Sequence, residues 1–160
     1  MGSSDKIKIF LVDDDAMFIE SLRHLLSEYR TDVRSFTNGE ECIRYLDEEP
    51  QIVILDYTLN NTLNGVQVLN KIKHTSPDTE VIMLSGAGSH NVKRDTLKYG
   101  AYDFIEKGEG AAVIVTKEVK QLCDEIESSK TMKKENNRIL KINAAIIILF
   151  ILIFILTRIK

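Results

Sequence analysis

The chain has 160 residues, of which 44% are hydrophobic and 28% charged, and its formal net charge is −3. This length allows one domain of ordinary size plus an appendage, and the composition is that of a folded protein rather than a disordered one. A charge so close to neutral gives no reason to expect nucleic acid as a partner. The two cysteines, Cys42 and Cys123, match no metal-binding or redox spacing, so we expect free, buried thiols.

Short apolar runs typical of strands alternate with stretches of helical periodicity through the first 127 residues. The expected strands are residues 7–12, 32–36, 52–55, 80–84 and 101–105, and the expected helices are residues 15–29, 39–48, 65–75, 90–99 and 112–127. Strict alternation predicts an α/β fold in which helices cover both faces of a parallel sheet. In such sheets the functional groups gather beyond the carboxyl ends of the strands.

Acidic residues stand at the ends of the first and third expected strands: the run Asp13-Asp14-Asp15 and, in the third strand, Asp56. Because parallel strands end at the same edge, we expect these carboxylates to lie close together. Crowded carboxylates repel one another unless a cation sits among them, and a site of oxygen ligands alone favours Mg²⁺. Acids that follow a strand are also common helix N-caps, which remains the alternative for Asp14 and Asp15.

Two further strand ends add a hydroxyl and an ammonium group. Ser85 ends the fourth expected strand, and Lys107 follows the fifth. Together with the acids, these groups suit phosphoryl transfer to a carboxylate. Asp56 is then the nucleophile, while Lys107 and Ser85 bind phosphoryl oxygens that the metal leaves uncovered.

Four segments together resemble the receiver domain of two-component response regulators, over about residues 6–127. These segments are Phe10–Asp15, Val53–Asp56, Met83–Gly86 and Gly100–Lys107. The resemblance implies a flavodoxin-like (βα)5 fold, a doubly wound parallel sheet with strand order 2-1-3-4-5. It also implies a signalling protein rather than an enzyme, which takes its phosphoryl group from a histidine kinase or a phosphotransfer protein and acts on a downstream protein.

The same resemblance assigns the metal ligands. Asp14 corresponds to a direct Mg²⁺ ligand, Asp13 to an acid that acts partly through water, and Asp56 to a ligand as well as the phosphoryl acceptor. The backbone carbonyl of Thr58 corresponds to a further ligand.

Ser85 and Phe104 fall at the family's switch positions, with Phe104 three residues before the lysine. The chain departs from the family pattern at two places. Gly108 stands where a proline usually follows the lysine, and the loop before Gly65 lacks the usual Met-Pro pair and is one residue longer.

The composition changes after the receiver segment. Residues 128–141 form a polar, basic linker, and every residue from Ala144 to Leu156 is apolar. This apolar run is about 20 Å of helix, and its flanks extend it to about 18 residues over 142–159, close to the roughly 20 that span a bilayer. We expect a C-terminal transmembrane anchor on the cytoplasmic face of the bacterial inner membrane, with an oligomerisation helix as the alternative.

Three hypotheses about function follow. The first is a stand-alone response regulator at the membrane, since too few residues follow position 127 for an output domain. The second is a receiver that no longer turns over phosphate and serves as a membrane-tethered scaffold. The third is a metal-dependent phosphatase, which the absence of an acid two residues after Asp56 disfavours, because Thr58 stands there.

Overall fold

The computed structural model describes residues 6–59, 63–86, 94 and 96–158. By its internal contacts the chain divides into two units, residues 1–120 and 121–160. The first unit is built on a sheet of five parallel strands, β1 (Ile7–Val12), β2 (Thr31–Phe36), β3 (Ile52–Asp56), β4 (Glu80–Ser85) and β5 (Asp103–Glu106). Their order is β2-β1-β3-β4-β5, which confirms the predicted doubly wound fold.

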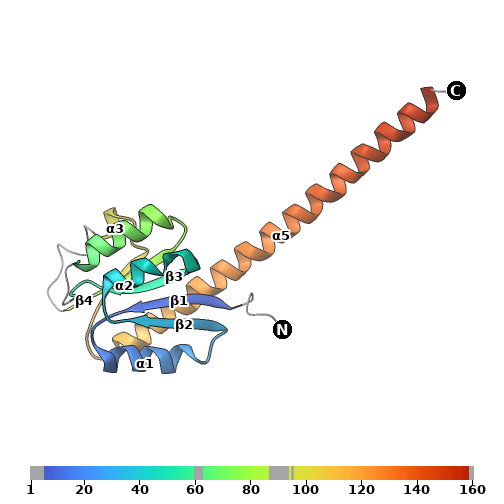
Figure 1. Ribbon diagram of the computed structural model, residues 1–160. Coiled ribbons are helices and arrows are strands. Elements are labelled where there is room, and N and C mark those ends of the chain that lie inside the picture. Colours follow the sequence, from blue (N-terminus) through green and yellow to red (C-terminus); the bar gives the residue numbers. More distant parts are fainter. Residues whose placement is uncertain (1–5, 60–62, 87–93, 95, 159–160) are drawn as a thin grey trace. The chain divides into compact units, whose positions relative to one another are not determined.

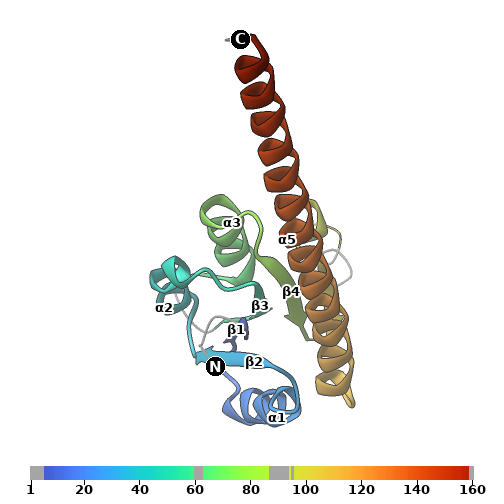
Figure 2. The same cartoon turned by 90° about the vertical axis from the view of Figure 1, so that its right-hand side faces the viewer.

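Helices cover both faces of this sheet. On one face lies α1 (Ala16–Leu26), and on the other lie α2 (Gly39–Arg44) and α3 (Gly65–Thr75) (Figures 1 and 2). The central strand β3 is buried along its whole length, as a strand covered on both sides must be. The first turns of α5 (Ala111–Arg158) add Ala111, Val115 and Val119 to the buried residues of this unit.

Local capping explains where two of these helices begin. The Asn64 side chain accepts a hydrogen bond from the Gln67 N–H, and the Gln67 side chain accepts one from the Asn64 N–H, so α3 starts with a capping box. At the start of α2 the Asn38 side chain accepts from the Glu41 N–H at 2.8 Å.

Within the first unit, three element boundaries differ from the prediction by two residues or more. The first helix ends at Leu26 rather than at residue 29. The second ends at Arg44, and a short 3-10 helix, η2 (Leu46–Glu48), follows before Glu49 turns the chain with a positive φ of 53°. The fifth strand starts at Asp103 rather than at residue 101, because Gly100 and Ala101 close the preceding helical turn.

Those two residues form a glycine cap of the Schellman type. The Gly100 N–H donates to the Leu97 carbonyl at 3.1 Å, and the Ala101 N–H donates to the Thr96 carbonyl at 3.1 Å. Gly100 has a φ of 89°, which a side chain would disfavour, and this explains why a glycine ends the helical turn. Half of the predicted helix at residues 90–99 lies outside the described residues.

The second unit is helical throughout its described residues. The predicted helix at residues 112–127 continues without a break through the basic linker and the apolar run, and α5 ends at Arg158. Residues 111–158 contain no proline and no glycine, so nothing in the sequence interrupts the backbone hydrogen bonds of the helix.

Candidate functional site

Neighbouring strands bring the predicted acids together. Asp13 directly follows β1, and Asp56 is the last residue of β3, which pairs with β1 in parallel register. Carboxylate oxygens of Asp13, Asp14 and Asp56 lie within 4.8 Å of one another, and Asp13 and Asp56 are each only 3% exposed. The predicted convergence of these acids on the carboxyl edge of the sheet is therefore confirmed.

Lys107 reaches this cluster from the edge of the sheet. It follows β5, and its backbone N–H donates to the Ser85 carbonyl at 2.7 Å, which fixes the start of the lysine side chain beside the end of β4. Its ammonium nitrogen lies 2.7 Å from Asp13 Oδ2 and 2.9 Å from Asp56 Oδ2. One ammonium group thus bridges the two most buried carboxylates of the cluster.

The electrostatics of this bridge show in two pKa shifts. Burial raises the pKa of Asp13, and this outweighs the lowering effect of the Lys107 ammonium and of a hydrogen bond from the Asp15 backbone. Burial by itself lowers the pKa of Lys107, but its hydrogen bonds to Asp13 and Asp56 more than offset this and leave that pKa raised. Lys107 therefore keeps its positive charge at neutral pH.

The acidic run after β1 divides into two roles. The Asp15 side chain accepts hydrogen bonds from the backbone N–H groups of Met17, at 2.9 Å, and Phe18, at 3.1 Å, so it is the N-cap of α1. Asp14 instead belongs to the carboxylate cluster. The capping alternative thus holds for Asp15 and not for Asp14.

The donor set fits Mg²⁺. Three carboxylates meet in the cluster, and the Lys107 ammonium pairs with two of them, so negative charge is concentrated there. Asp13 Oδ2 is fully buried, and the Lys107 ammonium beside it, at 2.7 Å, is shared with Asp56 Oδ2. A hard divalent cation that prefers oxygen ligands suits both features.

The remaining predicted residues lie around this cluster. Ser85 is the last residue of β4 and is 1% exposed, next to β5 in the sheet. Thr58 is exposed in the loop after β3, and its N–H donates to Asp56 Oδ1 at 3.3 Å. Phe104 on β5 is 8% exposed and belongs to the core cluster that packs under α2 and α3. The structure leaves the metal-binding role of the Thr58 carbonyl and the switch roles of Ser85 and Phe104 as predictions.

Sequence reasoning gave no structural role to two residues that position the cluster. Gly65 begins α3, and a β-carbon there would lie 2.4 Å from the Asp56 carbonyl oxygen. The ring centre of Phe18 lies 5.3 Å from the Lys107 ammonium nitrogen, a cation–π contact. A glycine at the start of a predicted helix was a usable signal for the first, whereas no spacing in the sequence pairs Phe18 with Lys107.

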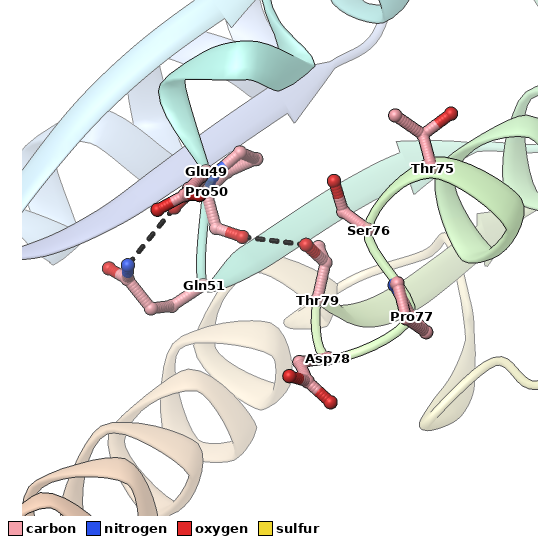
Figure 3. Close-up of a pocket in the computed structure, with 8 residues that line it drawn as sticks. All are labelled: Glu49, Pro50, Gln51, Thr75, Ser76, Pro77, Asp78 and Thr79. Carbon is pink, nitrogen blue, oxygen red and sulfur yellow. Dashed lines mark hydrogen bonds between the residues drawn. The ribbon is translucent and has the colours of Figure 1, made fainter.

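A separate pocket of about 370 Å³ opens at the other edge of the sheet, where β3 and β4 begin (Figure 3). It is lined by Glu49–Gln51 and Thr75–Thr79. Two hydrogen bonds join residues of its lining: the Thr79 hydroxyl donates to the Pro50 carbonyl at 2.8 Å, and the Gln51 amide donates to the Glu49 carbonyl at 3.0 Å. The pocket is therefore distinct from the carboxylate cluster.

Comparison with known families identifies the class of protein that this fold and this acidic cluster define. A model of the response regulator receiver domain matches residues 9–118, and the chain belongs to this family. Receiver domains are signalling switches rather than catalysts, they bind Mg²⁺ at a cluster of aspartates, and they interact with histidine kinases or phosphotransfer proteins and with downstream targets.

Individual relatives agree with this membership. The chain is 35% identical over 100 residues to the chemotaxis protein CheY of Listeria monocytogenes. The aligned part is 61% of this chain and 83% of that protein. It is 32% identical over 108 residues to a putative NtrX-like response regulator of Rickettsia felis, which covers 64% of this chain and 22% of that longer protein.

Among solved structures, the signal receiver domain of a putative Luxo repressor protein from Vibrio parahaemolyticus superimposes with a TM-score of 0.68 at 25% identity. The match covers 77% of this chain and 95% of that one. The receiver family model ends at residue 118, so the basic and apolar parts of α5 lie beyond the segment that defines the family.

Proposed function

We propose that this protein is a response regulator that accepts a phosphoryl group on Asp56 and signals through protein contacts at a membrane. The observation that carries the proposal is the bridge from the Lys107 ammonium nitrogen to Asp13 Oδ2 and Asp56 Oδ2, at 2.7 and 2.9 Å. A carboxylate held between an acidic cluster and a fixed positive charge suits attack on an anionic phosphoryl group.

In the proposed reaction, one Asp56 carboxylate oxygen forms a bond to phosphorus while the bond from phosphorus to the donor's histidine nitrogen breaks. The freed imidazole keeps the bonding electrons and takes a proton. The Lys107 ammonium moves from the Asp56 carboxylate to pair with one phosphoryl oxygen, and the Ser85 hydroxyl donates a hydrogen bond to a second phosphoryl oxygen. Asp13, Asp14, Asp56 and the Thr58 carbonyl would hold Mg²⁺, which would neutralise part of the negative charge of the phosphoryl oxygens.

The proposed location rests on the C-terminal part of α5. Among the described residues it includes one stretch long and apolar enough to cross a membrane, and none of that stretch is buried. Aliphatic side chains on all sides of a helix suit lipid better than water. Five basic residues between 130 and 141 precede the apolar run, and by the positive-inside rule they support a receiver on the cytoplasmic side.

Phosphorylation from a small donor tests the central claim. The full chain, incubated with acetyl phosphate and Mg²⁺, should gain one phosphoryl group that maps to Asp56, and Asp56→Asn should abolish it. Asp15→Asn is the matched control, because asparagine also caps helices and Asp15 lies outside the carboxylate cluster. Label that persists in Asp56→Asn would refute the acceptor, and failure of the parent chain to accept any label would favour the scaffold hypothesis.

A further inference from the structure

The part of α5 between the receiver and the apolar run has two different faces. Five exposed residues spaced by four, three, four and three positions form a stripe, here called the seam: Met132, Asn136, Ile139, Asn143 and Ile146. Met132 is 64% exposed, and Ile139 is 48% exposed. At about 100° per residue, the seam occupies a sector of about 80° around the helix.

Four of the five basic residues between 128 and 141 occupy the opposite side of the helix. Lys130, Lys134, Arg138 and Lys141 also fall within a sector of about 80°, and the centre of that sector lies about 165° from the centre of the seam. The other two charged residues of this stretch flank the seam on either side: Lys133 lies about 100° and Glu135 about 60° from its centre. Three exposed apolar side chains in line, at Met132, Ile139 and Ile146, favour a partner that covers them.

We propose that the seam pairs with the seam of a second copy of this chain, in parallel and in register. The spacing of alternately three and four residues is that of two helices packed with their side chains interlocked. Met132, Ile139 and Ile146 would stack on their own copies. The basic stripes would point outward, so the like charges of the two helices stay apart.

The two asparagines identify a second copy, rather than an unrelated apolar surface, as the occupant. A carboxamide both donates and accepts hydrogen bonds, so it can pair with its own copy across a two-fold axis. Asn136 and Asn143 are seven residues apart and therefore occupy equivalent places in the seam. Asparagine at such places is known to fix the register of paired helices, and near lipid an unpaired amide is costly.

Covering the seam with the membrane surface instead would require the helix to bend. Residues 121–158 form one continuous helix that contains no proline or glycine. If the apolar run crosses the bilayer, as proposed above, the segment that carries Met132 and Asn136 continues into water and cannot lie flat on the lipid. This step rests on the proposed membrane anchorage, whereas the pairing geometry does not.

Cysteine cross-linking of the full chain tests the pair. Single variants Met132→Cys and Ile139→Cys place a thiol in the seam, and Lys134→Cys and Asn137→Cys place one on the other side of the same helix. The parent chain is the background, since burial raises the pKa of Cys42 to about 12 and that of Cys123 to about 11 and keeps both thiols unreactive. Oxidation with copper phenanthroline should give at least about fivefold more dimer from the seam variants.

The outcomes separate this inference from the membrane proposal. The cross-link is measured in whichever cell fraction holds the chain, and seam-specific dimers in the soluble fraction would support the pair while contradicting the anchor. Equal yields on both sides of the helix, no dimer from any variant, or a product whose mass is not twice that of the chain would overturn the pair.

Adding Asn136→Ala and Asn143→Ala to Met132→Cys should lower its dimer yield severalfold, and an unchanged yield would overturn the role given to the amides.

Discussion

Gly65 and Asp56 touch through their backbones: a β-carbon on Gly65 would lie 2.4 Å from the carbonyl oxygen of Asp56 and 2.6 Å from the α-carbon of Tyr57. The Gly65 N–H also donates to the Tyr57 carbonyl at 3.0 Å. The first residue of α3 therefore holds the chain at the point where the proposed phosphoryl acceptor leaves β3.

Gly65→Ala should accordingly destabilise the receiver and disturb Asp56. Neither backbone neighbour can move without displacing the end of β3, so we expect a loss of about 1–3 kcal/mol in the free energy of unfolding, measured by urea denaturation. Gly108→Ala is the control, because a β-carbon there meets nothing within 4 Å, and it should be nearly neutral. Equal stabilities of the two variants would contradict the close-contact role.

Magnesium affinity should depend on Asp14 far more than on Asp15. Asp14→Ala removes a carboxylate from the cluster and should weaken Mg²⁺ binding at least about tenfold, equivalent to about 1.4 kcal/mol, in a calorimetric titration. Asp15→Ala removes the N-cap of α1, which should cost about 1 kcal/mol of stability while leaving Mg²⁺ affinity within a few-fold of the parent. An Asp14→Ala chain that binds the ion as tightly as the parent does would rule out the assignment.

The acidic run shows what could be predicted from sequence. The alternation of strands and helices predicted that Asp13 and Asp56 lie at one edge of a parallel sheet, because all strands of a doubly wound sheet end at the same edge. The same pattern could not separate Asp14 from Asp15. That distinction depends on which carboxylate turns toward the Met17 and Phe18 N–H groups, a matter of local backbone angles rather than of residue type.

Long-range contacts were the part that sequence could not provide. The need for glycine at position 65 arises from the approach of α3 to the end of β3, and the contact of Phe18 with Lys107 joins α1 to the far edge strand. The helical conformation of the predicted linker, residues 128–141, was missed for a different reason. A change of composition suggested a boundary, but lysine and glutamate are good helix formers, and no proline or glycine ends the helix there.

Phosphorylation should change the structure near Ser85 and Phe104 rather than on the opposite side of the domain. A Ser85 hydroxyl drawn to the phosphoryl group would shift the end of β4, and Phe104, packed in the core on neighbouring β5, would have to follow. Amide hydrogen exchange should change in residues 94–119 when the chain is phosphorylated. Ser85→Ala should still take label but lose much of this response.

Two results would count against that route. Exchange that changes only within residues 15–50 would place the readout on α1, β2 and α2 instead. An unaltered exchange response in phosphorylated Ser85→Ala would show that the hydroxyl does not transmit the signal.

Membrane attachment should depend on the apolar run within residues 142–159. Each of its nine Ile and Leu residues between 146 and 156 favours insertion by roughly 0.3–0.6 kcal/mol near the bilayer centre, which together is several kcal/mol. Replacing Ile148 and Ile151 with aspartate would cost about 2.5–3.5 kcal/mol each at that depth and cancel the gain.

The parent chain should stay with the membrane fraction through carbonate washing, whereas this double variant should be soluble. Ser128→Asp with Ser129→Asp adds the same charge outside the apolar run and should leave the chain in the membrane. If the parent chain itself is recovered in the soluble fraction as a discrete oligomer, the apolar run is an assembly helix and not an anchor.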